Sequence, residues 1–126
     1  MGYPVDVEID NIAFMAAAAP KPGRPVRGSD TGRPLMALFD LLGRRGCLAV
    51  LWALRGGPCA FRALQEATGG MASATLNTRT KELREAGLVE LGDDGYALTS
   101  WGTSLLEVGL PLEAWAVSWA ASAEEE

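Results

Sequence analysis

The sequence predicts a mainly α fold with one small β-hairpin. Apolar residues recur at helical spacing in successive segments, and a single turn sequence, Gly92-Asp93-Asp94-Gly95, separates two short apolar runs. The chain has 126 residues, of which 48% are hydrophobic and 21% are charged. That length supports one domain with a substantial core and is too short for two.

Residues 1–32 are predicted to form a flexible N-terminal arm. The stretch that leads into the domain is rich in Pro, Gly and Ala and has no hydrophobic periodicity. The folded domain is expected to span residues 33–122, with terminal helices that serve dimerisation. An acidic tail follows at residues 123–126.

Three helices are expected in the first half of the domain. Pro34 suits the first position of a helix, because its missing N–H would be unpaired there, and Gly43 ends that helix. Residues 47–54 form a second helix, which is so apolar that it must be central to the core. Residues 61–67 form a third, short helix, and the Thr-Gly-Gly sequence at 68–70 makes a tight turn after it.

A fourth helix is expected from about Ser73 to Ala86. Gly87 follows it and suits the left-handed conformation that often ends a helix. Three residues at helical spacing form the inner face of this helix: Leu76, Thr80 and Leu83.

Two short strands follow, at residues 88–91 and 96–98, and the acidic turn joins them. A last helix is expected after residues 99–102. Pro111 is predicted to kink or divide this helix, because a proline removes a backbone hydrogen bond. Its apolar positions are Leu105, Leu106, Leu110, Leu112, Trp115 and Trp119.

This order of elements is typical of a winged helix-turn-helix. A short helix, a glycine-containing turn and an amphipathic helix form the helix-turn-helix, and the hairpin directly after it is the wing. The arrangement points to double-stranded DNA as the partner. The major groove is about 12 Å wide and admits one α-helix, while the preceding helix braces it across the backbone.

The charge distribution agrees with a nucleic-acid partner although the net charge is −5. Residues 15–87 hold all eleven Lys and Arg residues and only five acids, whereas residues 88–126 hold eight acids and no base. DNA affinity must therefore come from the fourth helix and what precedes it. The wing tip, Asp93-Asp94, is expected to contribute little, and few phosphate contacts imply a shallow salt dependence.

Composition argues against catalysis and metal binding. The chain has no histidine, which removes imidazole catalysis and His-containing zinc sites. No pair of carboxylates has a spacing suited to acid–base chemistry. We expect no enzyme activity, no cofactor and no metal.

The two cysteines, Cys47 and Cys59, do not form a CxxC pair. We expect two small core residues in a reducing cytosol, with a redox-sensing thiol as the alternative. The longest apolar run, residues 47–54, is far short of the ~20 residues that span a bilayer. The protein is therefore expected to be cytoplasmic, with no membrane partner.

Four segments resemble the HxlR-type winged helix-turn-helix regulators: RPLMALFDLLGRR (33–45), CLAVLWALRGGPCAFRALQEATGG (47–70), LNTRTKELREAGLVE (76–90) and YALTSWG (96–102). The third segment is the most specific, and the resemblance covers roughly residues 33–120. It implies a homodimeric bacterial transcription factor that reads a pseudo-palindromic operator with the helix at about 73–86. Its terminal helices would build the dimer interface.

The chain departs from this family at several positions. Gly46 stands where the family usually has an aromatic residue, and Thr80 where it usually has leucine. Ala72-Ser73 replaces a common Ser-Pro, so the helix cap is lost or shifted to Ser73, a change of ~1 kcal/mol. The cysteine that some members carry near the N-terminus has no counterpart before Cys47, so thiol sensing does not transfer.

The candidate DNA-binding residues are polar or basic positions on the outer side of the fourth helix and at the start of the second. Asn77 can pair with adenine, and Arg79, which matches an arginine of the family, with guanine or phosphate. For Lys81, Glu82, Arg84 and Glu85 the alternative is a solvated helix end. The set is Ser73, Ala74, Thr75, Asn77, Thr78, Arg79, Lys81, Arg44 and Arg45.

The alternative function is a winged-helix scaffold that binds a small planar ligand or a protein partner, with weak or lost DNA binding. The acidic wing, the altered cap and Gly46 motivate it. Trp52, Trp115 and Trp119 are the candidate residues for a small-molecule effector, and core or dimer contacts are the simpler interpretation of these rings.

Overall fold

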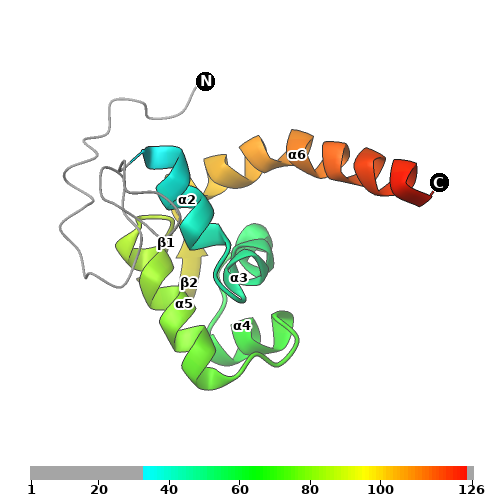
Figure 1. Cartoon of the computed structure of the whole chain (residues 1–126). Helices are drawn as coiled ribbons and strands as arrows, with labels where there is room; N and C mark the ends of the chain where they lie inside the picture. Colours follow the sequence, from blue (N-terminus) through cyan, green and yellow to red (C-terminus); the bar gives the residue numbers. More distant parts are fainter. Residues whose placement is uncertain (1–32, 125–126) are drawn as a thin grey trace.

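The computed structural model describes residues 33–124 and has the predicted winged helix-turn-helix architecture (Figure 1). The predicted arm at 1–32, including Arg24 and Arg27, lies outside the described residues, as do residues 125–126. The elements in chain order are α2 (Pro34–Leu42), α3 (Cys47–Ala53), the 3-10 turn η1 (Leu54–Gly56), α4 (Phe61–Ala67), α5 (Ser73–Glu85), β1 (Val89–Gly92), β2 (Gly95–Leu98) and α6 (Ser100–Glu124).

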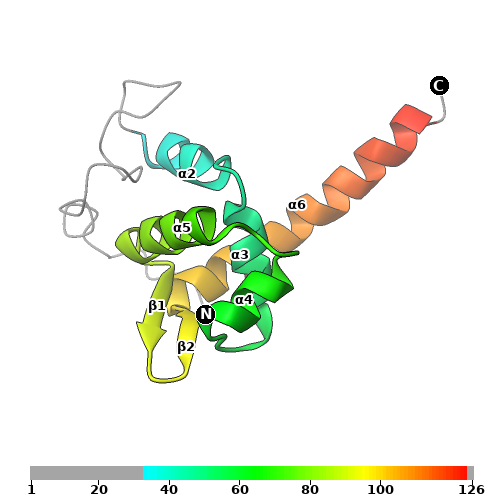
Figure 2. The same ribbon diagram turned by 90° about the horizontal axis from the view of Figure 1, so that it is seen from below.

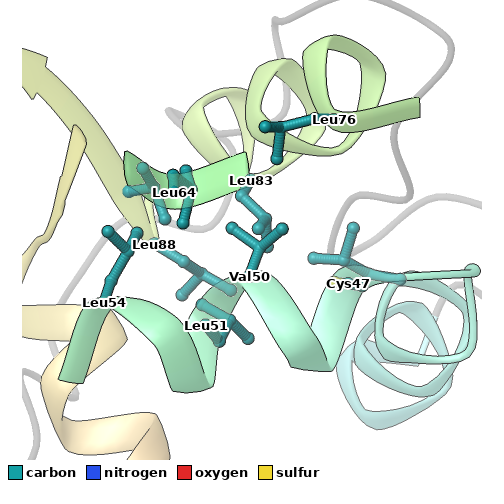
Figure 3. Packing of buried hydrophobic residues seen from close by; sticks show 10 residues of the cluster. Cys47, Val50, Leu51, Leu54, Leu64, Leu76, Leu83 and Leu88 are labelled. Carbon is teal, nitrogen blue, oxygen red and sulfur yellow. The ribbon is translucent and has the colours of Figure 1, made fainter. Parts of the chain in front are cut away.

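The core forms around α3, as its apolar sequence predicts (Figure 3). Val50 and Leu51 on α3 and Leu54 just after it are buried, and they pack with residues from α4, α5 and the start of the hairpin. Leu64 is the buried residue of α4. The inner face of α5 is as predicted, since Leu76, Thr80 and Leu83 are all buried.

A Schellman motif joins α5 to the hairpin. Gly87 has φ 81°, and its N–H donates to the carbonyl of Arg84 at 3.0 Å. The N–H of Leu88 donates to the carbonyl of Leu83 at 2.9 Å. These are the two bonds of the motif, and they turn the chain directly from α5 into β1.

The hairpin is a two-stranded antiparallel sheet in which Val89 pairs with Leu98 and Gly92 with Gly95. It is tied to the body of the domain at its second strand. The backbone of Cys59 exchanges two hydrogen bonds with that of Tyr96, at 2.9 and 2.8 Å. The segment between α3 and α4 thereby fixes the wing beside the helix-turn-helix.

Thr99 connects the wing to the last helix. Its hydroxyl donates to the carbonyl of Gly87 at 2.6 Å and accepts the N–H of Gly102 at 3.1 Å. The second bond is an N-cap of α6, because it satisfies an amide in the first turn that has no partner within the helix.

The last helix, α6, runs unbroken from Ser100 to Glu124 with Pro111 inside it. The predicted division at Pro111 is therefore wrong. Only the first turns of α6 pack on the core, through Leu105 and Leu106. The rest projects away from the domain in both views (Figures 1 and 2).

Candidate nucleic-acid interface

The turn between α4 and α5 sets the direction of the candidate recognition helix. Gln65 on α4 donates from its Nε2 to the carbonyl of Met71 at 2.9 Å and to the hydroxyl of Ser73 at 3.1 Å. Ala72 is the N-cap residue and makes no side-chain cap bond. The cap is therefore lost rather than shifted to Ser73, and Gln65 holds the entry of α5 in its place.

The outer side of α5 is exposed at most of the predicted positions. Asn77 and Lys81 lie in the open and line a pocket of about 680 Å³ between α5 and the hairpin. The hydroxyl of Thr78 donates back to the carbonyl of Ala74 at 3.0 Å, and Thr75 is half-buried. The exposed side of this helix therefore presents the polar side chains of Asn77, Lys81 and Arg84.

Arg79 is held by the protein instead of extending into solvent. Its Nε donates to the carbonyl of Arg45 at 2.7 Å, and its Nη1 pairs with Glu82 Oε1 at 2.6 Å. Arg44 pairs with the other oxygen of Glu82 at 2.7 Å and with Asp40 at 3.2 Å. We call these four residues, Asp40, Arg44, Arg79 and Glu82, the Glu82 cluster.

Two acids expected at a solvated helix end are in fact buried. Glu82 is 4% exposed and Glu85 is 8% exposed, so that interpretation is wrong for them, while Lys81 and Arg84 are exposed as it requires. Glu82 was not among the predicted site residues. Its spacing of three from Arg79 was visible in the sequence, but its pairing with Arg44 spans 38 residues and could not be read from local pattern.

The three predicted arginines converge on one pocket, which we call the arginine pocket. It has a volume of about 410 Å³ and lies where the turn between α2 and α3 meets α5. Arg45 is exposed at its rim. The lining residues are Gly43, Arg44, Arg45, Thr78, Arg79 and Glu82.

Gly46, beside this pocket, has a conformational reason for replacing an aromatic residue. It has φ 85°, a region that favours glycine, and it precedes the first residue of α3. A Cβ there would lie 2.7 Å from the terminal methyl of Met71. The Met71 side chain occupies the space that a larger residue at position 46 would need.

The wing carries no positive charge. Glu90, Asp93 and Asp94 are exposed on it, and the hairpin from Val89 to Leu98 contains no Lys or Arg. Its Coulomb interaction with phosphate is therefore repulsive.

Both cysteines are free thiols, and Cys47 is completely buried. Burial, and secondarily the negative charge of Glu82, raise the pKa of the Cys47 thiol to about 11. A thiol with so high a pKa carries almost no thiolate at neutral pH and is a poor nucleophile. Cys47 is thus a core residue, and Cys59 is half-buried.

The tryptophans proposed for a ligand do not form one site in the single chain. Trp115 and Trp119 stack on each other on the projecting part of α6, with ring centroids 5.8 Å apart. Trp52 lies on α3 and carries the guanidinium of Arg55 at 4.1 Å from its ring centre. Among residues 33–124, no ring contact joins Trp52 to the stacked pair.

No cluster suited to a metal occurs among residues 33–124, and no helix in that range is both long and apolar enough to cross a bilayer.

No protein-family model matches the sequence. An uncharacterised helix-turn-helix-type transcriptional regulator of Methanocaldococcus jannaschii is 27% identical over 88 residues, which is 67% of this chain and 83% of that protein. The quinone-bound YodB of B. subtilis superposes with a TM-score of 0.64 at 32% identity, over 67% of this chain and 96% of that chain.

Proposed function

The chain belongs to the helix-turn-helix transcriptional regulators. We propose that it is a homodimeric regulator of the HxlR type that reads a pseudo-palindromic operator with α5. The observation that carries this proposal is the arginine pocket beside the exposed face of α5. We further propose that it acts in a bacterial cytoplasm. The sequence resemblance over residues 33–120 supports both statements.

The arginine pocket is suited to a DNA phosphate. Three guanidinium groups surround it against one carboxylate, and guanidinium forks match the geometry of phosphate oxygens. A phosphate there fixes the position of α5 on the duplex without reading sequence. Asn77, Lys81 and the first turn of α5, from Ser73 to Thr75, then face the base edges.

The projecting part of α6 supports dimerisation. Its apolar residues Val108, Leu112, Trp115 and Trp119 follow one another at spacings of four, three and four, the a/d pattern of a coiled-coil seam. We call them the α6 row. The last three are more than 60% exposed in the single chain, which is unfavourable for a soluble domain unless another surface covers them. A second copy, placing its α6 against this one, would cover both rows.

Replacement of Arg79 tests the proposed DNA contact. We expect Arg79→Ala to weaken binding to a selected operator about tenfold or more, since a hydrogen bond to a charged group contributes ~1.5–3 kcal/mol. Arg55→Ala is the matched control, because it also removes one guanidinium. That guanidinium is exposed and lies over the ring of Trp52, outside the arginine pocket. Fluorescence anisotropy of a labelled duplex gives both affinities, and equal losses in the two variants would contradict a specific role for Arg79.

A second candidate function is the binding of a planar small-molecule effector, which the quinone-bound neighbour and one ring contact favour. YodB is a protein whose structure holds a quinone, and Trp115 and Trp119 form a stacked aromatic surface on α6. A planar effector bound near these rings would quench their fluorescence. Titration with planar ligands discriminates this candidate: quenching by one of them at micromolar concentration supports it, and the absence of quenching by all of them argues against it.

A further inference from the structure

The Glu82 cluster places a negative charge where the proposed function needs a positive surface. Glu82 is 4% exposed, and it is one of the residues that line the arginine pocket. Simple electrostatics predicts that a carboxylate so close to a bound phosphate weakens DNA binding, because like charges repel. The contacts of Glu82 indicate the opposite effect.

Each oxygen of Glu82 holds a different guanidinium. Oε1 accepts from Arg79 at 2.6 Å and Oε2 accepts from Arg44 at 2.7 Å. The two arginines come from different parts of the chain, one from α5 and one from the turn after α2. Glu82 is therefore the group that brings them to the same pocket.

The second bond of Arg79 completes its fixed orientation. Its Nε donates to the carbonyl of Arg45 at 2.7 Å, so the side chain is held at two points. Within residues 33–124 the Nη2 group of Arg79 has no hydrogen-bond partner in the protein. A guanidinium with five N–H donors can satisfy Glu82 and the Arg45 carbonyl and still offer donors to a phosphate.

We infer that Glu82 is a positioning residue for DNA binding: it holds Arg44 and Arg79 in the orientation that receives a backbone phosphate. This inference rests on the proposed function. An arginine that is already ordered loses less conformational entropy when it binds than one that is free. The gain from ordering two arginines outweighs the repulsion between one carboxylate and one phosphate.

The test compares Glu82→Gln with the parent chain and with Glu90→Gln. Each variant removes one negative charge: Glu82→Gln removes it from the arginine pocket, and Glu90→Gln from an exposed position on β1. The probe is the best duplex of about 30 base pairs, or three turns, that the parent chain selects from a random pool. We expect Glu82→Gln to raise the Kd about fivefold or more, because two arginines each lose one of the contacts that order them, and Glu90→Gln to leave it unchanged or lower it.

Side-chain NMR of the DNA-free dimer gives a readout that loss of charge alone does not move. We expect the Nη1–H of Arg79, which donates to Glu82 Oε1, to exchange slowly with water in the parent chain and fast in Glu82→Gln. Retained slow exchange, or a Kd equal to or below that of the parent, would overturn the inference. Failure of the parent chain to bind any duplex would overturn the proposed function first and the inference with it.

A milder variant keeps the test valid if Glu82→Gln does not fold, which circular dichroism shows. Asp40→Asn removes the Asp40 carboxylate, which pairs with Arg44 at 3.2 Å, and leaves Glu82 in place. We expect the Kd to rise about twofold, as for partial release of one arginine. A Kd equal to or below that of the parent would overturn the inference here too.

Discussion

At the scale of single residues, the buried thiol of Cys47 makes the domain less stable as the pH rises into the alkaline range. Its pKa rises from the ordinary value of 9.0 to about 11 in the folded chain. Between these values the unfolded chain releases the proton and the folded chain keeps it. The stabilising contribution is therefore fully present below pH 9 and is lost as pH rises to 11.

We predict that the unfolding free energy of the parent chain falls between pH 9 and pH 11 by about 2–3 kcal/mol more than that of Cys47→Ala. The figure follows from two pKa units at ~1.36 kcal/mol each. Urea titrations of both chains at the two pH values measure it. Parallel pH dependences in the two chains would show that the thiol stays exposed to solvent or ionises freely.

The residues of the site differ in how far sequence predicts them. Asn77, Lys81 and the inner face of α5 follow from helical periodicity, which is a local property. The pairing of Glu82 with Arg44 is a tertiary contact across 38 residues, and no local pattern reveals it. The space beside Gly46 is likewise filled through a tertiary contact, by the side chain of Met71 from the turn before α5.

At the scale of elements, the fold is predicted well where turn chemistry and periodicity agree. The end of α5 at Gly87 appears in the structure as expected, and the hairpin turns within the predicted sequence at 92–95, where Gly92 and Gly95 pair as the last residues of the two strands. The continuous α6 differs, because Pro111 lies in an exposed helix with no neighbour that enforces a break. The loss of one backbone hydrogen bond does not end a helix of 25 residues.

The α6 row also belongs to the scale of elements, and it predicts the oligomeric state. We expect Leu112→Asp to convert the dimer to a monomer, because a charge in an apolar helix seam must be buried without a partner. DNA affinity should then fall as well, since one half-site is read instead of two. Analytical ultracentrifugation at micromolar concentration measures the mass.

Ala114→Asp is the matched control for this change, because Ala114 is exposed on the opposite side of α6 and receives the same charge. It should remain dimeric. A monomeric parent chain, or a dimeric Leu112→Asp variant, would show that α6 is not the interface.

At the scale of the whole molecule, the charge arrangement restricts how the domain can lie on DNA. Of the eight Lys and Arg residues in the range 33–124, five lie on α5 and the turn between α2 and α3, whereas the wing and α6 carry acids without bases. The wing should therefore contribute little to the contact with phosphate. With few phosphates neutralised, the affinity should fall only gently with salt, since the slope scales with their number.

Selection of duplexes from a random pool by the purified full chain tests whether the protein reads a pseudo-palindromic operator with α5. We expect enrichment of a two-fold-related sequence whose half-site centres lie about one helical turn, 10–10.5 base pairs, or a multiple of it apart. We expect Arg79→Ala to recover much less DNA of every sequence, because loss of a phosphate contact weakens binding to all duplexes. A folded dimer that enriches no sequence and binds no duplex at low salt would show that the protein is not a DNA-binding regulator.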